Sequence, residues 1–137
     1  MLVKKFYCSI LFVLIVGTLF AQESAVFEEP KNGPKIVFSE NRYEFGDIIQ
    51  GDIIEHVFEF TNSGNAPLVL QDVKTTCGCT VPEWPRSPLA PGATAELKVK
   101  FNSAGKIGIQ NKVITVISNA TNQTSRVMIV TNVNSKS

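Results

Sequence analysis

The stretch from Thr94 to Phe101 alternates without exception between polar and apolar residues, and this feature restricts the fold more than any other. Ala95, Leu97, Val99 and Phe101 are apolar, and the residues between them are Thr, Glu or Lys. Successive side chains of a β-strand point to opposite faces, so the pattern predicts a strand with one buried and one solvated face. Such a strand has to bury its apolar face against a second layer.

Further short β-rich runs lie between clusters of turn-forming residues, at 36–38, 43–45, 54–60, 68–76, 113–117 and 126–133. We expect 36–38 and 43–45 to form one first strand broken by a bend and closed at 46–47. The turn formers in 61–67 predict a hairpin-type connection, and Pro91 followed by Gly92 predicts a type II turn. No segment shows a 3.6-residue apolar period. Six or seven strands within about 100 residues predict an all-β, immunoglobulin-like β-sandwich of about seven strands, with a small barrel as the alternative architecture.

The first 21 residues have the order of a signal peptide. Lys4 and Lys5 precede an uncharged, mostly apolar run at 6–20, and Ala21 is a small residue suited to cleavage. The alternatives are a buried core segment and an uncleaved membrane anchor, but the run is shorter than the about 20 apolar residues of a spanning helix. We therefore expect a signal peptide at 1–21, a flexible leader at 22–35, a sandwich domain at 36–134, and export to the periplasm or the extracellular space.

The charge balance points to no charged partner. The 13 basic and 12 acidic residues of the whole chain create no field that would attract nucleic acid or an anionic membrane surface. We expect no nucleic acid, no stable membrane span after cleavage and no cofactor.

Cys77, Gly78 and Cys79 form the one chemically suggestive triplet of the mature chain. Two thiols separated by glycine can close into a disulfide, exchange with other thiols, or bind copper(I), which soft thiolates select. A complete metal site needs further ligands, and the mature chain offers only His56 and Met128. The simplest interpretation is structural, and the redox and copper(I) interpretations stay open beside it.

His56 and Trp84 have structural and functional interpretations too. His56 shares a strand face with apolar residues, which is typical of a hydrogen-bonded core or rim histidine, and no nucleophile elbow is present. We therefore predict no catalytic residue, no metal site and no enzyme activity. Trp84 lies between Pro82 and Pro85, where its indole forms a lid over the sandwich or contacts a sugar or peptide ligand.

Four phrases of the sequence together resemble a known family. They are the run from Phe58 to Leu68, the Thr76–Thr80 element with its two cysteines, the turn around Pro91, and Val99 to Asn102. They resemble the domain of unknown function 1573 family, over residues 43–133. The members of this family are mostly exported proteins of Bacteroidetes and related bacteria. The resemblance therefore implies an exported protein with an immunoglobulin-like fold, akin to the modules of major sperm protein and cilium-associated proteins. It implies no catalytic residue, because no function is established for the family.

The sequence therefore leads us to expect a non-catalytic binding or structural module of the cell envelope. Its partner would be an unidentified envelope protein or a glycan, bound through loops or a free sheet edge, since an exposed strand can accept another chain. The alternative is a thiol redox or copper(I)-binding protein that acts through Cys77 and Cys79.

Overall fold

The computed structural model describes residues 32–137, so the expected signal peptide and residues 22–31 of the expected leader lie outside the described part of the chain. The described chain contains no apolar helix long enough to cross a bilayer. Every regular element in it is a β-strand. The eight strands are β1 (Ile36–Phe38), β2 (Arg42–Ile49), β3 (Ile53–Asn62), β4 (Leu70–Thr75), β5 (Thr80–Glu83), β6 (Thr94–Asn102), β7 (Gly108–Ser118) and β8 (Thr124–Asn134).

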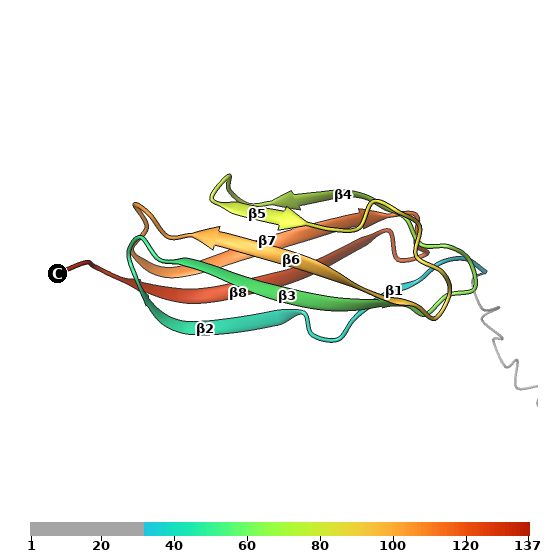
Figure 1. The fold of residues 1–137 in the computed structure, drawn as a ribbon, viewed down its shortest axis with the longest axis horizontal. Helices are drawn as coiled ribbons and strands as arrows, with labels where there is room; N and C mark the ends of the chain where they lie inside the picture. The colour runs from blue at the N-terminus through green and yellow to red at the C-terminus, as the bar shows by residue number, and fades with distance from the viewer. Residues whose placement is uncertain (1–31) are drawn as a thin grey trace, which may run out of the picture.

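The strands form two four-stranded sheets that face each other (Figure 1). The first sheet, which we call sheet A, has the order β1-β3-β6-β5, and the second, sheet B, has the order β2-β8-β7-β4. All neighbours are antiparallel except β2 and β8, which run parallel. The predicted immunoglobulin-like sandwich is confirmed, with eight strands in place of about seven.

The predicted first strand is in fact two strands in different sheets. β1 pairs with β3 in sheet A, and the chain then crosses to sheet B, where β2 runs beside β8. The prediction that 46–47 ends this segment was wrong, because β2 continues to Ile49 through a bulge between Glu44 and Gly46. Gly46 has a φ of 75°, a conformation that glycine adopts without strain, so the strand bends there and does not stop.

Two other local predictions need correction. The turn-rich segment 61–67 is not a hairpin, because β3 lies in sheet A and β4 in sheet B, so this connection crosses between the layers. The short strand β5 was missed, since its four residues include Pro82 and show little apolar periodicity. The predicted type II turn agrees with the structure: Gly92 has a φ of 78°, and Ala93 N donates to Ala90 O at 3.0 Å.

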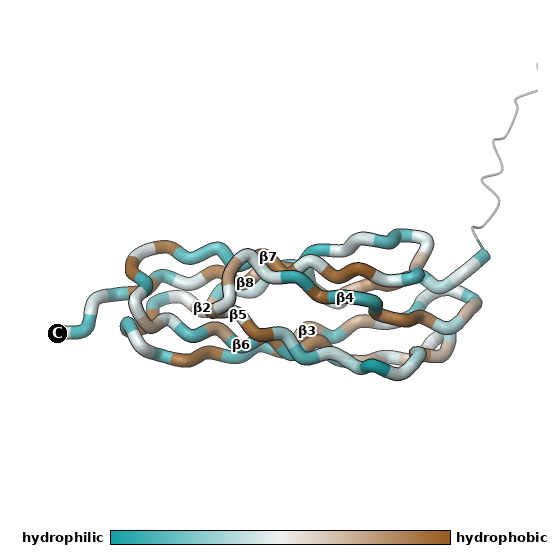
Figure 2. Tube along the Cα trace, turned by 90° about the horizontal axis from the view of Figure 1, so that it is seen from above, coloured by the Kyte–Doolittle hydropathy of each residue, from teal (hydrophilic) through white to brown (hydrophobic). Residues whose placement is uncertain are grey.

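The core lies between the sheets and consists of the inward-facing residues of the alternating strands. Apolar and polar positions alternate along the strands in Figure 2. Leu97, Val99 and Phe101 of β6 are fully buried, as the alternation from Thr94 to Phe101 predicts. From β3 the core receives Phe58 and Phe60. Each strand thus buries one face, which is the condition for a two-layer sandwich.

Asn62, at the end of β3, is a polar residue buried within this core. Its Nδ2 donates to the carbonyl oxygens of Ala66 (2.7 Å) and Leu89 (3.0 Å), and its Oδ1 accepts from the backbone N–H groups of Lys35 (3.2 Å) and Gly64 (3.1 Å). One side chain therefore satisfies four backbone groups where the chain leaves sheet A. Residues 32–35, the described end of the expected leader, are joined to the domain here.

Candidate functional site

The two cysteines lie in the connection between β4 and β5, where the chain passes from the edge of sheet B to the edge of sheet A. Cys77 and Cys79 are joined in a disulfide, with their Cα atoms 5.4 Å apart. Gly78 between them is exposed, and a Cβ added there would meet no atom within 4 Å. The disulfide thus lies within one loop and does not link distant strands.

The backbone of this loop has its own hydrogen bonds. The Thr75 hydroxyl lies 3.0 Å from Cys77 O and 3.2 Å from Thr80 O, and Thr80 N donates to Cys77 O at 3.3 Å. On the other side Asn102 N donates to Cys79 O at 3.0 Å, which joins the loop to β6. These contacts hold the loop without any contribution from the sulfur atoms.

The surroundings of the two cysteines differ. Cys77 Sγ lies 3.8 Å from the hydroxyl of Thr80, a residue that is buried in the sandwich. Cys79 instead lines a shallow hollow of about 320 Å³ on the outer face of sheet A, together with Ile53, Gly78, Val81, Lys100, Asn102 and Ala104. Both cysteines are half-buried. Cys77 has a buried hydroxyl as its neighbour, whereas Cys79 packs against the core and also lines the hollow.

Other potential metal ligands do not gather at this pair. Between residues 32 and 137, no three His, Cys, Asp or Glu side chains are placed to share a metal ion. In the disulfide, neither sulfur is the thiolate that binds copper(I). Copper binding would require reduction of this bond first.

His56 is part of an aromatic cluster on the β2 and β3 side of the sandwich. Its ring stacks on Tyr43, with 3.7 Å between centroids and 12° between planes, and it meets Phe45 and Phe58 edge-on. Its Nε2 contacts the carboxylate of Glu40. The ring is thus held by Tyr43 on one face, by edge contacts with two phenylalanines and by Glu40 at one nitrogen, which agrees with the predicted rim histidine.

Trp84 follows β5 and packs, half-buried, against the core. The guanidinium of Arg86 lies over its ring, 3.8 Å from the centroid. Its Nε1 is buried without a hydrogen-bond partner among the described residues. A sugar or peptide would have to displace Arg86 to stack on the indole, so the predicted ligand contact stays a prediction and the lid position is what the structure describes.

Lys112 points from β7 toward sheet A, where its Nζ lies 5.5 Å from the centre of the Phe101 ring. Burial lowers the pKa of Lys112 below its ordinary value of 10.5, and the charge of Lys106 lowers it further. Phe101 pairs with Thr80 in sheet A. The ammonium group therefore lies at the same end of the sandwich as the cysteine loop.

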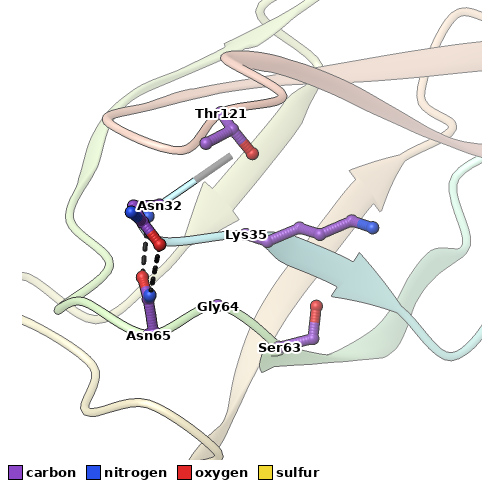
Figure 3. A pocket seen from close by; sticks show the side chains of 7 residues that line it. Asn32, Lys35, Ser63, Gly64, Asn65 and Thr121 are labelled. Atoms are coloured by element: carbon purple, nitrogen blue, oxygen red, sulfur yellow. Dashed lines mark hydrogen bonds between the residues drawn. The ribbon is translucent and has the colours of Figure 1, made fainter. Parts of the chain in front are cut away.

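A polar pocket of about 450 Å³ lies where the described chain begins, and Figure 3 shows its lining. Gly33 N donates to Asn65 Oδ1 at 2.7 Å, and Asn65 Nδ2 donates to Asn32 Oδ1 at 3.1 Å. Lys35 supplies the single charged side chain of the lining. The hydrogen bonds identify this pocket as the junction between leader and domain.

The sequence led us to expect a free sheet edge without locating it, and the structure shows one at the outer edge of β3. β1 pairs only with residues 60–62 of β3, so the part from Ile53 to Val57 has β6 as its one strand neighbour among the described strands. Ser39 N, on the β1 side, donates to Glu59 O, whereas Asn62 N bonds to Ala93 O on the β6 side. Because bonding directions alternate along a strand, the backbone groups of Ile53, Glu55 and Val57 point outward from this edge.

The side chains of these residues lie on the outer face of sheet A. Ile53 is 59% exposed and Val57 39% exposed. Between them Glu55 pairs with Lys100 at 3.1 Å. Val81 of β5, 55% exposed, lies across Lys100 on the same face. In the sequence, these two apolar residues on the solvent-facing side of β3 signalled an unusual surface, but not that it lies at an open edge.

Comparison with solved structures identifies similar folds. A protein of unknown function from Porphyromonas gingivalis W83 superposes with a TM-score of 0.64 at 19% identity, covering 74% of this chain and 47% of that protein. PapD-like domain 7 of human CEP192 gives 0.61 at 11% identity, covering 75% and 87%. The secreted serine protease VesC from Vibrio cholerae gives 0.57 at 15% identity, covering 72% and 23%. This chain spans about half of the Porphyromonas protein and about a quarter of VesC, so these likenesses describe the fold alone.

A search of curated proteins finds no match to this chain. The family model described as Protein of unknown function (DUF1573) matches residues 36–133, from the first residue of β1 to the next-to-last residue of β8. The match therefore includes both sheets, the cysteine loop and the β3 edge. On this evidence the chain belongs to the DUF1573 family.

Proposed function

We propose that this domain is a non-catalytic, exported module of the bacterial cell envelope that binds a partner protein by accepting one of its extended segments at the outer edge of β3. The observation that carries the proposal is the outer edge of β3 from Ile53 to Val57, whose backbone groups pair with no strand within residues 32–137. An exposed edge of this kind is a template for another strand, which supplies main-chain hydrogen bonds, while the neighbouring side chains supply specificity. The export signal expected at residues 1–21 supports the envelope location.

Three other sheet edges, those of β5, β2 and β4, carry features that discourage pairing. Asn102 N donates to Cys79 O, so the backbone groups of Cys79 point toward β6. Bonding directions alternate along a strand, so the nitrogen of Pro82 points outward from β5, and proline has no N–H to donate there. β2 is bulged between Glu44 and Gly46, and the register of β4 shifts after Leu70. Bulges and proline are common protections of edge strands. The register of β3 with β6 is unbroken from 53 to 61, so its edge is regular and open.

The side chains favour a partner of different sequence over a second copy of this chain. A two-fold copy paired antiparallel about Glu55 would place two Glu55 carboxylates opposite each other, and like charges opposite each other destabilise a strand pair. An incoming strand fits better with apolar residues opposite Ile53 and Val57 and a basic or neutral residue opposite Glu55. The partner is therefore expected to contain an extended segment whose alternate residues are apolar, basic or neutral, and apolar.

The experiment compares two substitutions of one residue. Photo-crosslinking of the exported full-length protein in cells identifies the bound protein, and its purified form is then titrated with wild type, Val57→Ala and Val57→Pro. Proline removes the outward N–H without removing a bond to β6, so Val57→Pro is expected to weaken binding roughly tenfold or more. Val57→Ala keeps the N–H and is expected to cost less.

Circular dichroism and thermal unfolding serve as the control that both variants fold. Equal binding by Val57→Pro and wild type, with the fold retained, would overturn strand addition at this edge. A concentration-dependent homodimer that dissociates in Val57→Pro would replace the partner protein with a second copy. A partner retained by Val57→Pro but lost in Trp84→Ala would move the binding surface to the indole.

A further inference from the structure

The disulfide contributes little as a structural staple. It closes a ring of three residues, and the entropy that a cross-link removes from the unfolded chain grows with the size of the closed loop. The loop backbone is also held by Thr75 and Asn102, as described above. The only two cysteines after residue 21 thus form a bond with a small stabilising effect. This favours a role in which the disulfide reacts over one in which it stabilises the fold.

The buried hydroxyl of Thr80 suits the reduced state of Cys77 better than the oxidised state. Within residues 32–137, Cys77 Sγ is the one hydrogen-bond partner that the structure gives this hydroxyl. Thr80 is 3% exposed, and a buried hydroxyl costs free energy unless it is well bonded. A disulfide sulfur is a weak acceptor, whereas a thiolate accepts a charge-assisted hydrogen bond. Thr80 is therefore placed to stabilise a thiolate on Cys77.

We propose that the Cys77–Cys79 bond is a thiol–disulfide exchange site that oxidises a dithiol of another protein, with Cys79 as the sulfur attacked and Cys77 as the leaving group. Cys79 is half-buried and is the one of the two cysteines that lines the hollow on sheet A, so we place the approach of the incoming thiolate there. Exchange is faster when the leaving thiolate is more stable, and Thr80 stabilises the one on Cys77. Lys112 adds positive charge at the same end of the sandwich.

The reaction has two steps. A thiolate of the partner bonds to Cys79 Sγ as the bond between Cys79 and Cys77 breaks, and the electron pair stays on Cys77 as a thiolate. The second thiolate of the partner then attacks the partner sulfur of this mixed disulfide and releases Cys79. The partner loses two electrons and gains a disulfide, and Cys77 and Cys79 take up the two protons of its thiols. This exchange reaction does not depend on the strand addition proposed at the β3 edge.

The first experiment measures how fast dithiothreitol, a small dithiol, reduces the folded full-length protein. Alkylation at timed intervals followed by mass spectrometry gives the rate for wild type, Thr80→Val and Thr76→Val. Valine keeps the shape of threonine but removes the hydroxyl, so Thr80→Val is expected to be reduced roughly five- to tenfold more slowly. Thr76→Val, an exposed neighbour in the same loop, is the matched control and is expected to react like wild type.

A second experiment locates the attacked sulfur. Wild-type protein is treated with reduced glutathione, quenched in acid, and its mixed disulfide is mapped by peptide fragmentation. The proposal expects glutathione on Cys79. Glutathione on Cys77, equal rates for Thr80→Val and Thr76→Val, or reduction no faster than global unfolding would each overturn it. The last result would identify a structural disulfide, and circular dichroism confirms that each variant is folded.

Discussion

Tyr43 of β2 and His56 of β3 stack face to face, with 3.7 Å between their ring centroids, and so connect sheet B to sheet A. Stacked aromatic pairs contribute about 0.5–1.5 kcal/mol beyond their buried area. We predict a coupling free energy of this size between Tyr43→Ala and His56→Ala in a double-mutant cycle measured by urea denaturation. Tyr43→Ala combined with Val81→Ala, on different strands and different sheets, should be additive. Additivity for the stacked pair as well would contradict this role.

Removal of the Asn62 side chain is predicted to cost at least about 3 kcal/mol of unfolding free energy, because it leaves several buried backbone groups without a hydrogen bond. Chemical denaturation of Asn62→Ala gives the value. Asn111→Ala, an exposed asparagine of β7, is the control and should change stability by less than about 0.5 kcal/mol. Similar losses for both variants would show that Asn62 does not hold this junction.

Two glycines are expected to differ in their tolerance of alanine. A Cβ at Gly64 would overlap the backbone of Gly33 and Lys35, whereas a Cβ at Gly78 meets nothing within 4 Å. Gly64→Ala is predicted to destabilise the domain by about 1–3 kcal/mol through overpacking. Gly78→Ala should stay within about 0.5 kcal/mol of wild type. Thermal unfolding compares them directly, and a Gly64→Ala variant as stable as wild type would contradict the close packing.

The lowered pKa of Lys112 makes stability depend on pH. The unfolded chain binds a proton at this lysine more readily than the folded chain, so wild-type stability is predicted to rise with pH from the lowered pKa of Lys112 up to its ordinary value near 10.5. Lys112→Met has no such proton and should lack this rise. It should also be more stable than wild type at neutral pH, because a desolvated charge is gone. Urea titrations at several pH values test both expectations.

Loss of the disulfide is predicted to cost little stability. For a ring of three residues, the loop-entropy relation gives roughly 1.5 kcal/mol, less than the usual 2–4 kcal/mol. The double variant Cys77→Ser, Cys79→Ser should therefore fold, with a small loss measured by guanidinium unfolding. A loss above about 4 kcal/mol would show that the bond is a structural staple.

The strands were predictable where one face is buried. The alternation of β6 set Leu97, Val99 and Phe101 inward, and the structure confirms all three. Prediction failed where a strand bends or is very short. β2 continues through Gly46 because β8 supplies a continuous partner for it, and β5 exists because β6 pairs with it. Such partners are distant in sequence and leave no local pattern.

The site was predictable in part. Cys77 and Cys79 stood out by their spacing. The different surroundings of the two cysteines could not be predicted from the sequence. These surroundings depend on the burial of Thr80 and on Ile53 and Lys100, which belong to other strands.

By itself the sequence determined which side chains face the core, because a period of two residues is a local property of the chain. It also determined the family through its spaced motifs. Only the tertiary structure decided which strands are edges, which edge is open, and which cysteine lines the hollow on sheet A. A central strand and an edge strand each bury the one face that points to the core, so both show the same alternation of apolar and polar residues. Their difference lies in backbone hydrogen bonds to strands far along the chain, which form only when the sheets assemble.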